Sequence, residues 1–411
     1  MAEPSDFMGL AHSNMKKQGP LHVATPLRES LALTKVAGTS VYIKLESSQP
    51  TGSFKIRGIG HLCKTDCKYP GSGEGVGGKP TAATWPWFVP LDKWSERGCK
   101  RFVCCSGGNA GMAAAYSARH LSIPATIVVP SVTPPSTVQR LKDEGADVII
   151  HGKALNESIS YGEELVANNP GSVFISPFDD PLIWEGHSSL VRELEEDLKE
   201  KPGAVVLSVG GGGLMNGVVE GLRHAGWADV PVVAMETHGA HSFNAAVKAG
   251  RLVTLPEITS IATTLGLATV SAQSLKLSGE HPVFSEVVTD QDAVRAVERF
   301  LDDEKILVEP ACGATLAAVY CGIIERLQGE GKLKQALGPV VVVVCGGNNI
   351  SMEQLRGFKK KLGMLEQQFF ITIRGPCGHA LQLDAAPPPG GAASKRKKKR
   401  KKKLKKINNN K

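Results

Sequence analysis

The sequence lacks several features that would assign it to a protein class at once. None of its apolar runs approaches the ~20 residues needed to cross a bilayer. The N-terminal MAEPSDFMGL has no basic stretch followed by an apolar one, so we expect no secretion signal there. The nine cysteines form no C-x-x-C pair with histidine spacing, and several lie in apolar, strand-like runs. These absences indicate reduced thiols in a cytoplasmic protein, without disulfides, a zinc site or a membrane span.

Acidic residues are absent from 395–411, which holds twelve Lys and Arg residues. The net charge of +8 comes from this stretch, and the rest of the chain carries −4. Residues 365–411 also lose any strand–helix rhythm and contain APPPGG, so we predict a disordered basic tail. Such a run could bind polyanions or act as a nuclear address. Because the basic run 395–411 has no aromatic residue, we favour a solvated tail and no nucleic-acid partner.

Short β-branched runs alternate with longer helical patterns through much of the chain. Four of these runs are typical of buried parallel strands: 125–130, 204–210, 231–237 and 339–347. Helical patterns follow glycine-rich turns at 109–121 and 214–225. The alternation predicts an α/β protein with open, mostly parallel sheets, in which ligands lie where strand ends meet helix starts.

Residues 65–92 interrupt this pattern. They are rich in Gly and Pro, show no period, and divide a helix that would otherwise run from IRGIGHLCK into KWSERGCK. A loop of this length inside a compact domain is unusual.

The glycine-rich VGGGGLMNG (209–217) follows a strand and opens a helix. Exposed amides and the helix dipole at such a place favour a phosphate, whereas the alternative is a flexible linker. No G-x-G-x-x-G can be placed here, which argues against a dinucleotide site. Glu236 nevertheless stands about where a ribose-binding acid would be, so a nicotinamide-dependent enzyme remains an alternative.

Two further strand ends carry polar or reactive residues. CSGGNAG (105–111) has exposed amides and a hydroxyl suited to a carboxylate, and its Asn109 could hold a ligand oxygen or cap the helix. Cys345 ends the valine-rich run, where most cysteines are small core residues.

Lys55 lies in TGSFKIRG (51–58), a corner of small residues before an apolar helix. A surface lysine is the default interpretation, whereas a desolvated amine would have a lowered pKa and suit imine chemistry. Together the four sites call for one ligand with a phosphate, a carbonyl for the amine and room for a carboxylate.

Long motifs over residues 20–64 and 93–364 resemble one family. They are PLHVATPL, GTSVYIKLESSQPTGSFKIRGIGH, GNAGMAAAYSARHL, PATIVVP, PFDDPLIWEGH, VGGGGLMNGVVEGL, AMETHGAHSFNAA, DDEKILVEPACGA and VVVCGGNNIS. The chain resembles the fold-type II pyridoxal-phosphate enzymes, and within them the serine dehydratase and serine dehydratase-like proteins. The resemblance implies two open sheets flanked by helices, with a large domain (1–48 and 180–364) and a small one (49–179, including 65–92).

The resemblance also implies roles for site residues. Lys55 would form the Schiff base with pyridoxal 5'-phosphate, Phe54 would pack on the pyridine ring, and Cys345 would face the pyridine nitrogen. The implied phosphate ligands are the backbone amides of Gly210, Gly211, Gly212, Gly213 and Leu214. Asn109 would hold the ring hydroxyl, while the implied carboxylate site is Ser106, Gly107, Gly108 and Asn109. A monovalent cation, expected to be K⁺, would be held by Gly210, Glu236, Ala240, Leu265 and Leu267.

The implied reaction is β-elimination from L-serine to pyruvate and ammonia, and from L-threonine to 2-oxobutanoate and ammonia. Lys55, freed from the cofactor by the substrate, would take the Cα proton. The resemblance further implies a homodimer and a role in amino-acid metabolism and gluconeogenesis.

Four departures from the family pattern stand out. Cys105 replaces a usual serine, and Gly107 matches the serine dehydratase-like branch where the other branch has alanine. Residues 65–92 and the tail have no family counterpart, and we hypothesise that an unspliced intron or a misread gene end supplies them. The insertion also leaves open a catalytically impaired pyridoxal-phosphate-binding protein.

Overall fold

The computed structural model describes residues 19–68, 99–364, 370–374 and 380–384. Its contacts divide the chain into two units, Met1–Leu362 and Gly363–Lys411. No helix among these residues is long and apolar enough to cross a membrane.

The larger sheet has six strands in the order β1-β2-β10-β7-β8-β9. The strands are β1 (Leu27–Glu29), β2 (Val41–Lys44), β7 (Ala204–Ser208), β8 (Val232–Thr237), β9 (Val283–Val288) and β10 (Val340–Val343). All neighbours are parallel except β1, which pairs antiparallel with β2. The central strand β10 consists of four consecutive valines. Both faces of this strand are covered, so the side chains on both faces must be apolar.

The smaller sheet is entirely parallel, in the order β5-β4-β3-β6. Its strands are β3 (Arg101–Cys104), β4 (Ala125–Val129), β5 (Asp147–Ile150) and β6 (Ser172–Phe174). A core of alanine, isoleucine and leucine side chains fills the space between this sheet and the helices beside it. The alanine-rich helix after β3 packs closely because its side chains are small.

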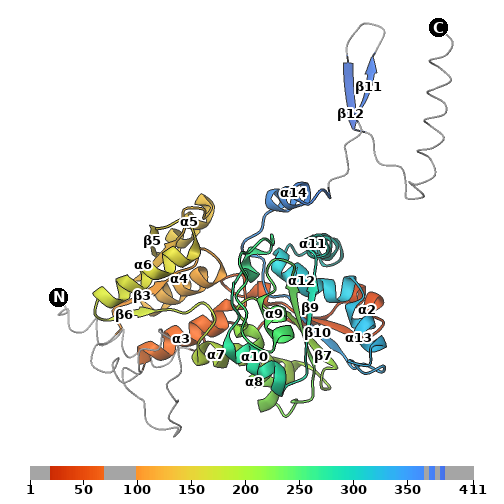
Figure 1. Ribbon diagram of the computed structural model, residues 1–411, viewed down its shortest axis with the longest axis horizontal. Helices are drawn as coiled ribbons and strands as arrows, with labels where there is room; N and C mark the ends of the chain where they lie inside the picture. The colour runs from red at the N-terminus through yellow and green to blue at the C-terminus, as the bar shows by residue number, and fades with distance from the viewer. Residues whose placement is uncertain (1–18, 69–98, 365–369, 375–379, 385–411) are drawn as a thin grey trace, which may run out of the picture. The chain divides into compact units, whose positions relative to one another are not determined.

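Helices cover both sheets (Figure 1). Those of the first half are α2 (Leu31–Ala37), α3 (Lys55–Lys68), α4 (Asn109–Leu121), α5 (Pro135–Asp143), α6 (Leu155–Asn168) and α7 (Pro181–Asp197). Those of the second half are α8 (Gly213–His224), α9 (Ser242–Ala249), α10 (Ala272–Glu280), α11 (Asp290–Glu304), α12 (Pro310–Tyr320), α13 (Ile323–Gly329) and α14 (Met352–Lys361). Two short 3-10 helices are η1 (Glu46–Ser48) and η3 (Thr263–Leu265). Helix α12, buried from Pro310 to Val319, packs across β7, β8 and β10, while α7 packs on both α3 and α8.

The fold class predicted from the sequence is confirmed: the chain has two open sheets, mostly parallel and flanked by helices. The six-stranded sheet takes its strands from 27–44 and 204–343, and the four-stranded sheet from 101–174. The domain boundaries themselves stay a prediction.

Two boundary predictions need correction. The loop expected at 65–92 begins too early, because α3 continues to Lys68. Residues 69–92 lie outside the described residues. The tail was expected to be free of regular structure, yet β11 (Phe370–Arg374) and β12 (Ala380–Asp384) pair antiparallel within the smaller unit. The prediction failed there because two short strands without a neighbouring helix carry little periodic signal. Residues 385–411, with the basic run, lie outside the described residues.

Candidate active site

The corner before α3 lies against the end of β10. Ser53 bridges to Gly346, and the Phe54 N–H donates to the Cys345 carbonyl at 3.2 Å. The Gly347 N–H donates to the Gly52 carbonyl at 3.2 Å. These backbone contacts bring the two residues on either side of the expected cofactor ring, Lys55 and Cys345, to one place.

Lys55 is the first residue of α3 and is half-buried. Its Nζ donates to the Pro177 carbonyl at 2.5 Å, in the loop after β6. Burial lowers the pKa of Lys55 to about 8, while the nearby thiols of Cys104 and Cys345 act in the opposite direction. The structure therefore favours the pocket amine over the surface lysine. An amine with this pKa is partly neutral near physiological pH.

Aromatic rings stand beside this amine. The Lys55 Nζ lies 5.4 Å from the centre of the Phe54 ring, and that ring lies 5.1 Å from the ring of His187. His187 is completely buried, and among the described residues neither of its ring nitrogens has a hydrogen-bond partner. Burial, followed by the charges of Lys55 and Arg57, holds the pKa of His187 well below its usual range, so the ring is neutral.

The glycine loop after β7 fits a phosphate. Within the described part of the chain, the amides of 210–214 donate to no protein acceptor, and Gly212 offers no side-chain cap to α8. A Cβ on Gly211 would lie 2.3 Å from the Phe178 ring, and one on Gly213 would lie 2.6 Å from the Phe178 carbonyl. Gly212 has φ +92°, a conformation that favours glycine. Positions 211, 212 and 213 therefore require glycine, and the free amides of this loop at a helix N-terminus suit an anion.

The turn after β3 holds the residues expected to bind a carboxylate. Ser106 accepts a hydrogen bond from the Gly108 N–H at 3.2 Å, and residues 106–109 are all half-buried. The N-cap of α4 is Gly108, without a side-chain cap, so Asn109 does not cap the helix. This removes the capping alternative and leaves the Asn109 amide for a partner inside the site.

Cys105, the departure from the family serine, points away from this turn. Its Sγ donates to the Ser158 carbonyl at 3.2 Å, and a Cβ on Gly162 would lie 2.2 Å from the Sγ. Burial raises the pKa of Cys105 to about 12, so the thiol stays protonated. The substitution is accommodated in the packing against α6.

Glu309 is a site residue that the sequence reasoning missed. It is 3% exposed and immediately precedes Pro310, the first residue of α12. Its carboxylate accepts the Asn109 Nδ2, at 3.0 and 3.2 Å, and also the Asn349 N–H and the Thr264 hydroxyl, at 2.8 and 3.0 Å. A signal was available, because the motif DDEKILVEPACGA holds this acid just before a helix-starting proline.

Cys345 lies two residues beyond the end of β10, with its side chain in the core. Its Sγ lies 3.6 Å from the Ser208 hydroxyl, and its residue is 6% exposed. Beside it, burial and a hydrogen bond with Cys345 hold the pKa of Cys312 well above its usual range. Cys345 therefore lies among thiol and hydroxyl groups at this end of the site.

The expected cation ligands gather at the carboxyl end of β8. Glu236 is completely buried, and its two oxygens accept the Phe243 and Asn244 N–H groups at 2.9 and 2.7 Å. Burial raises the pKa of Glu236 to about 8, with the two backbone bonds opposing it. A Cβ on Gly210 would lie 3.1 Å from the Cα of Leu265, so these two backbones approach closely. Within the described ranges, no group of three or more His, Cys, Asp or Glu side chains could hold a metal.

Glu236 also bears on the nicotinamide alternative. A ribose-binding acid must reach a bound nucleotide, but this carboxylate faces the start of α9 and is fully enclosed. The structure therefore gives no support to that alternative.

Two lobes of α/β structure, a buried lysine at a helix start and a glycine loop fit for phosphate define a fold-type II pyridoxal-phosphate enzyme. The chain belongs to the pyridoxal-phosphate dependent enzyme family, whose model matches residues 20–346.

The chain aligns with nearly the whole length of several proteins of known name. The human protein named L-serine dehydratase/L-threonine deaminase is 60% identical over 345 residues, which are 84% of this chain and 97% of the relative. The human protein named serine dehydratase-like is 52% identical over 349 residues, 85% of this chain and 97% of the relative. A crystal structure of a fungal L-serine ammonia-lyase from Rhizomucor miehei has a TM-score of 0.72 at 38% identity, covering 83% of this chain and 99% of that one.

Proposed function

We propose that this chain is an L-serine/L-threonine dehydratase that converts L-serine to pyruvate and ammonia, and L-threonine to 2-oxobutanoate and ammonia. The names of the similar proteins support the substrate class. The observation that carries the proposal is the Lys55 amine, whose pKa burial lowers to about 8. It follows the corner where the backbone of 52–54 is hydrogen-bonded to that of 345–347.

Pyridoxal phosphate, when bound, supplies the electron sink that makes cleavage of the Cα–H bond of an amino acid accessible. We propose that the amides of 210–214 hold its phosphate and that Asn109 holds its ring hydroxyl. Cys345 would lie at the pyridine nitrogen. A thiol does not keep that nitrogen protonated as an aspartate would, so the sink would be weaker. A weaker sink suits an elimination, in which the β-hydroxyl departs soon after the proton.

The substrate is positioned by the turn after β3. The amides of 106–108 and the Ser106 hydroxyl would bind the substrate carboxylate, which fixes the Cα–H bond toward Lys55. The neutral Lys55 amine then takes the Cα proton, and the β-hydroxyl leaves with a proton as water. Glu309 keeps the Asn109 amide in place through the 3.0 and 3.2 Å contacts.

We further propose that a monovalent cation, expected to be K⁺, binds the carbonyls of Gly210, Ala240, Leu265 and Leu267 together with Glu236. In support, Glu236 is a buried carboxylate that faces only two neutral N–H donors in the described structure. A nearby cation would offset the cost of burying its charge. A cytoplasmic location and a homodimer stay predictions.

The test is an assay of the purified full-length protein for pyruvate from L-serine, combined with the visible absorbance of lysine-bound cofactor. Lys55→Ala should lose both signals, whereas Lys35→Ala, on the exposed side of α2, should keep both. A fully active Lys55→Ala variant would refute the proposal. A wild-type protein that absorbs but forms no keto acid would instead favour the impaired cofactor-binding alternative.

A further inference from the structure

Arg57 follows the candidate catalytic lysine by two residues and is completely buried. Each residue of a helix turns the side-chain direction by ~100°, so two residues turn it by about 200°. The side chains of Lys55 and Arg57 therefore leave α3 on opposite sides. Lys55 reaches the Pro177 carbonyl, while Arg57 reaches η1 and α7. A buried guanidinium is rare unless it is fully paired, so its partners show what this side of α3 is attached to.

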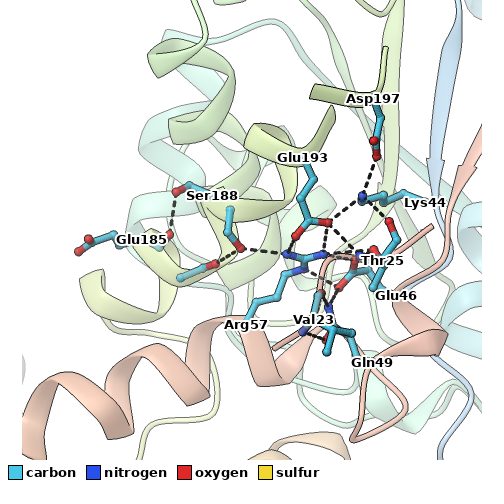
Figure 2. A network of polar contacts seen from close by, with 12 residues as sticks. Val23, Thr25, Lys44, Glu46, Gln49, Arg57, Glu185, Ser188, Glu193 and Asp197 are labelled. Atoms are coloured by element: carbon cyan, nitrogen blue, oxygen red, sulfur yellow. Dashed lines mark hydrogen bonds and ion pairs between the residues drawn. The ribbon is translucent and has the colours of Figure 1, made fainter. Parts of the chain in front are cut away.

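Two carboxylates grip Arg57 from different elements (Figure 2). Its Nε and Nη2 donate to the two oxygens of Glu46, each at 2.7 Å. Its Nη1 and Nη2 donate to the two oxygens of Glu193, at 2.5 and 2.7 Å. Paired contacts of this kind fix the plane of a guanidinium as well as its position. The first turn of α3 is therefore held between η1 and α7.

The buried cation Lys44 contacts Glu193 directly and is connected to Glu46 through Thr25. The Lys44 Nζ contacts Glu193 Oε2 at 2.8 Å and donates to the Thr25 carbonyl at 2.8 Å. The Thr25 hydroxyl donates to Glu46 at 2.6 Å. Lys44, Glu46 and Arg57 all have 0% exposed side chains. Although burial raises the pKa of Glu193, the hydrogen bonds from Arg57 and Lys44 lower it to about 2, so this carboxylate stays ionised.

Through Lys44, the network is joined to the strands that position Cys345. Lys44 is the last residue of β2 and pairs in register with Val343 of β10, two residues before Cys345. The ion network around Arg57 and the strand that leads to Cys345 are therefore joined directly through the β2–β10 pair. Buried ion networks are weak evidence for stability because desolvation offsets the attraction, so a fixed geometry is their better-attested advantage.

We infer that Arg57, gripped by Glu46 and Glu193, is the positioning residue that keeps Lys55 at its buried place relative to Cys345. This rests on the proposed role of Lys55 as the reacting amine. The four charged groups act on the backbone of α3, and none of them is among the residues that we assign to the substrate or the cofactor.

The variant that tests this is Arg57→Lys, which keeps the charge but loses the planar fork. We expect a folded protein whose kcat for pyruvate formation falls by about tenfold or more, while KM changes by less than about threefold, because misplacement of a reacting group costs rate. Arg28→Lys is the matched control, since Arg28 pairs with Glu304 and its side chain is 44% exposed. The control should keep the wild-type values.

A second readout separates positioning from stability. Peptide-resolved acylation of the full-length chain, freed of cofactor, measures the pH at which Lys55 becomes reactive. The groups facing Lys55 are Cys104, Cys345 and His187, and none of them changes in the variant. We expect the midpoint to rise from about 8 toward that of an ordinary lysine in Arg57→Lys, because a loosened helix end admits water to the amine.

A folded Arg57→Lys protein with the wild-type kcat and the wild-type Lys55 midpoint overturns the inference, whatever its melting temperature. If that variant does not fold, Glu193→Gln is judged by the same two readouts, because it preserves shape and leaves the Glu46 pair intact. If the wild type forms no pyruvate, the proposed function fails. The Lys55 midpoint still tests Arg57 in that case.

Discussion

Asn109 and Glu309 are joined across the site, although 200 positions separate them in the chain: the Asn109 Nδ2 lies 3.0 and 3.2 Å from the two oxygens of the Glu309 carboxylate. Asn109 opens α4 beside the four-stranded sheet, and Glu309 precedes α12 beside the six-stranded one. The same carboxylate accepts the Asn349 N–H and the Thr264 hydroxyl. One buried acid therefore ties the substrate turn to the frame that carries Cys345.

Glu309→Ala should lower the free energy of unfolding by about 1–3 kcal/mol, because the half-buried Asn109 and Asn349 donors lose their acceptor, whereas the exposed Thr264 hydroxyl can turn to water. Glu309→Gln should cost at most about 1 kcal/mol, since its amide oxygen can still accept from Asn109 and Asn349. Urea unfolding of the two variants and the wild type at one pH measures the difference. Equal losses in the two variants would contradict the role of the carboxylate as a shared acceptor.

The proposed role of Lys55 as the base predicts the pH dependence of turnover. The amine takes a proton only when it is neutral, and burial lowers its pKa to about 8. Below that pH the rate of pyruvate formation should rise about tenfold per unit, and it should level off above pH 8. Initial rates across pH 6 to 9.5, at constant ionic strength, measure the profile. A rate independent of pH through this range would rule out Lys55 as the base with the assigned pKa.

The sequence predicted the elements that local pattern controls. The valine-rich strands, the glycine loop before α8 and the start of α4 at Asn109 follow from period and turn chemistry. Lys55 could be selected from among the lysines only because several glycine-rich corners and the family resemblance pointed to one ligand.

Contacts between distant residues could not be predicted in the same way. Glu309 meets Asn109 only after both sheets have formed, and nothing near Asn109 in sequence indicates an acid. Likewise, Cys105 and Ser106 are neighbours in the chain, but the Cys105 Sγ contacts α6 while the Ser106 hydroxyl lies in the turn, which the sequence does not indicate. The attachment of Arg57 to Glu193, 136 positions away, is a third case.

Gly107→Ala tests the space beside the substrate turn. An added Cβ would lie 2.9 Å from the Thr133 Cγ2 and 3.1 Å from its hydroxyl, so the loop after β4 must shift. Overpacking of this kind costs about 1–3 kcal/mol, and it displaces the amides that we assign to the carboxylate. We expect a rise in KM for L-serine that is larger than the fall in kcat.

Thr133→Ser removes the methyl group that an alanine at 107 would meet. Gly107→Ala combined with Thr133→Ser should therefore recover most of the lost affinity, while Thr133→Ser alone should leave the kinetics near the wild type. Steady-state kinetics of the three variants form a double-mutant cycle. Additive effects in that cycle would show that the two residues do not meet.

We predict that Glu236 links the stability of the chain to the proposed monovalent cation. Burial raises its pKa in the folded chain to about 8, above the ordinary value of 4.5. Without a cation, the stability supplied by the protonated carboxyl is fully present below about pH 4.5 and is lost as the pH rises through about 8. A bound cation favours the carboxylate and offsets this loss. KCl should therefore raise the melting temperature more at pH 9 than at pH 6, by roughly 2 °C or more.

The matched salt is tetramethylammonium chloride at the same ionic strength, because that cation is too large for a carbonyl-lined site. Glu236→Gln should flatten the dependence of the melting temperature on pH and remove the difference between the two salts. Its amide oxygen can still accept a backbone N–H, as Glu236 does from Phe243 at 2.9 Å, so the variant should fold. Identical melting temperatures of the wild type in the two salts at pH 9 would show that Glu236 holds no cation.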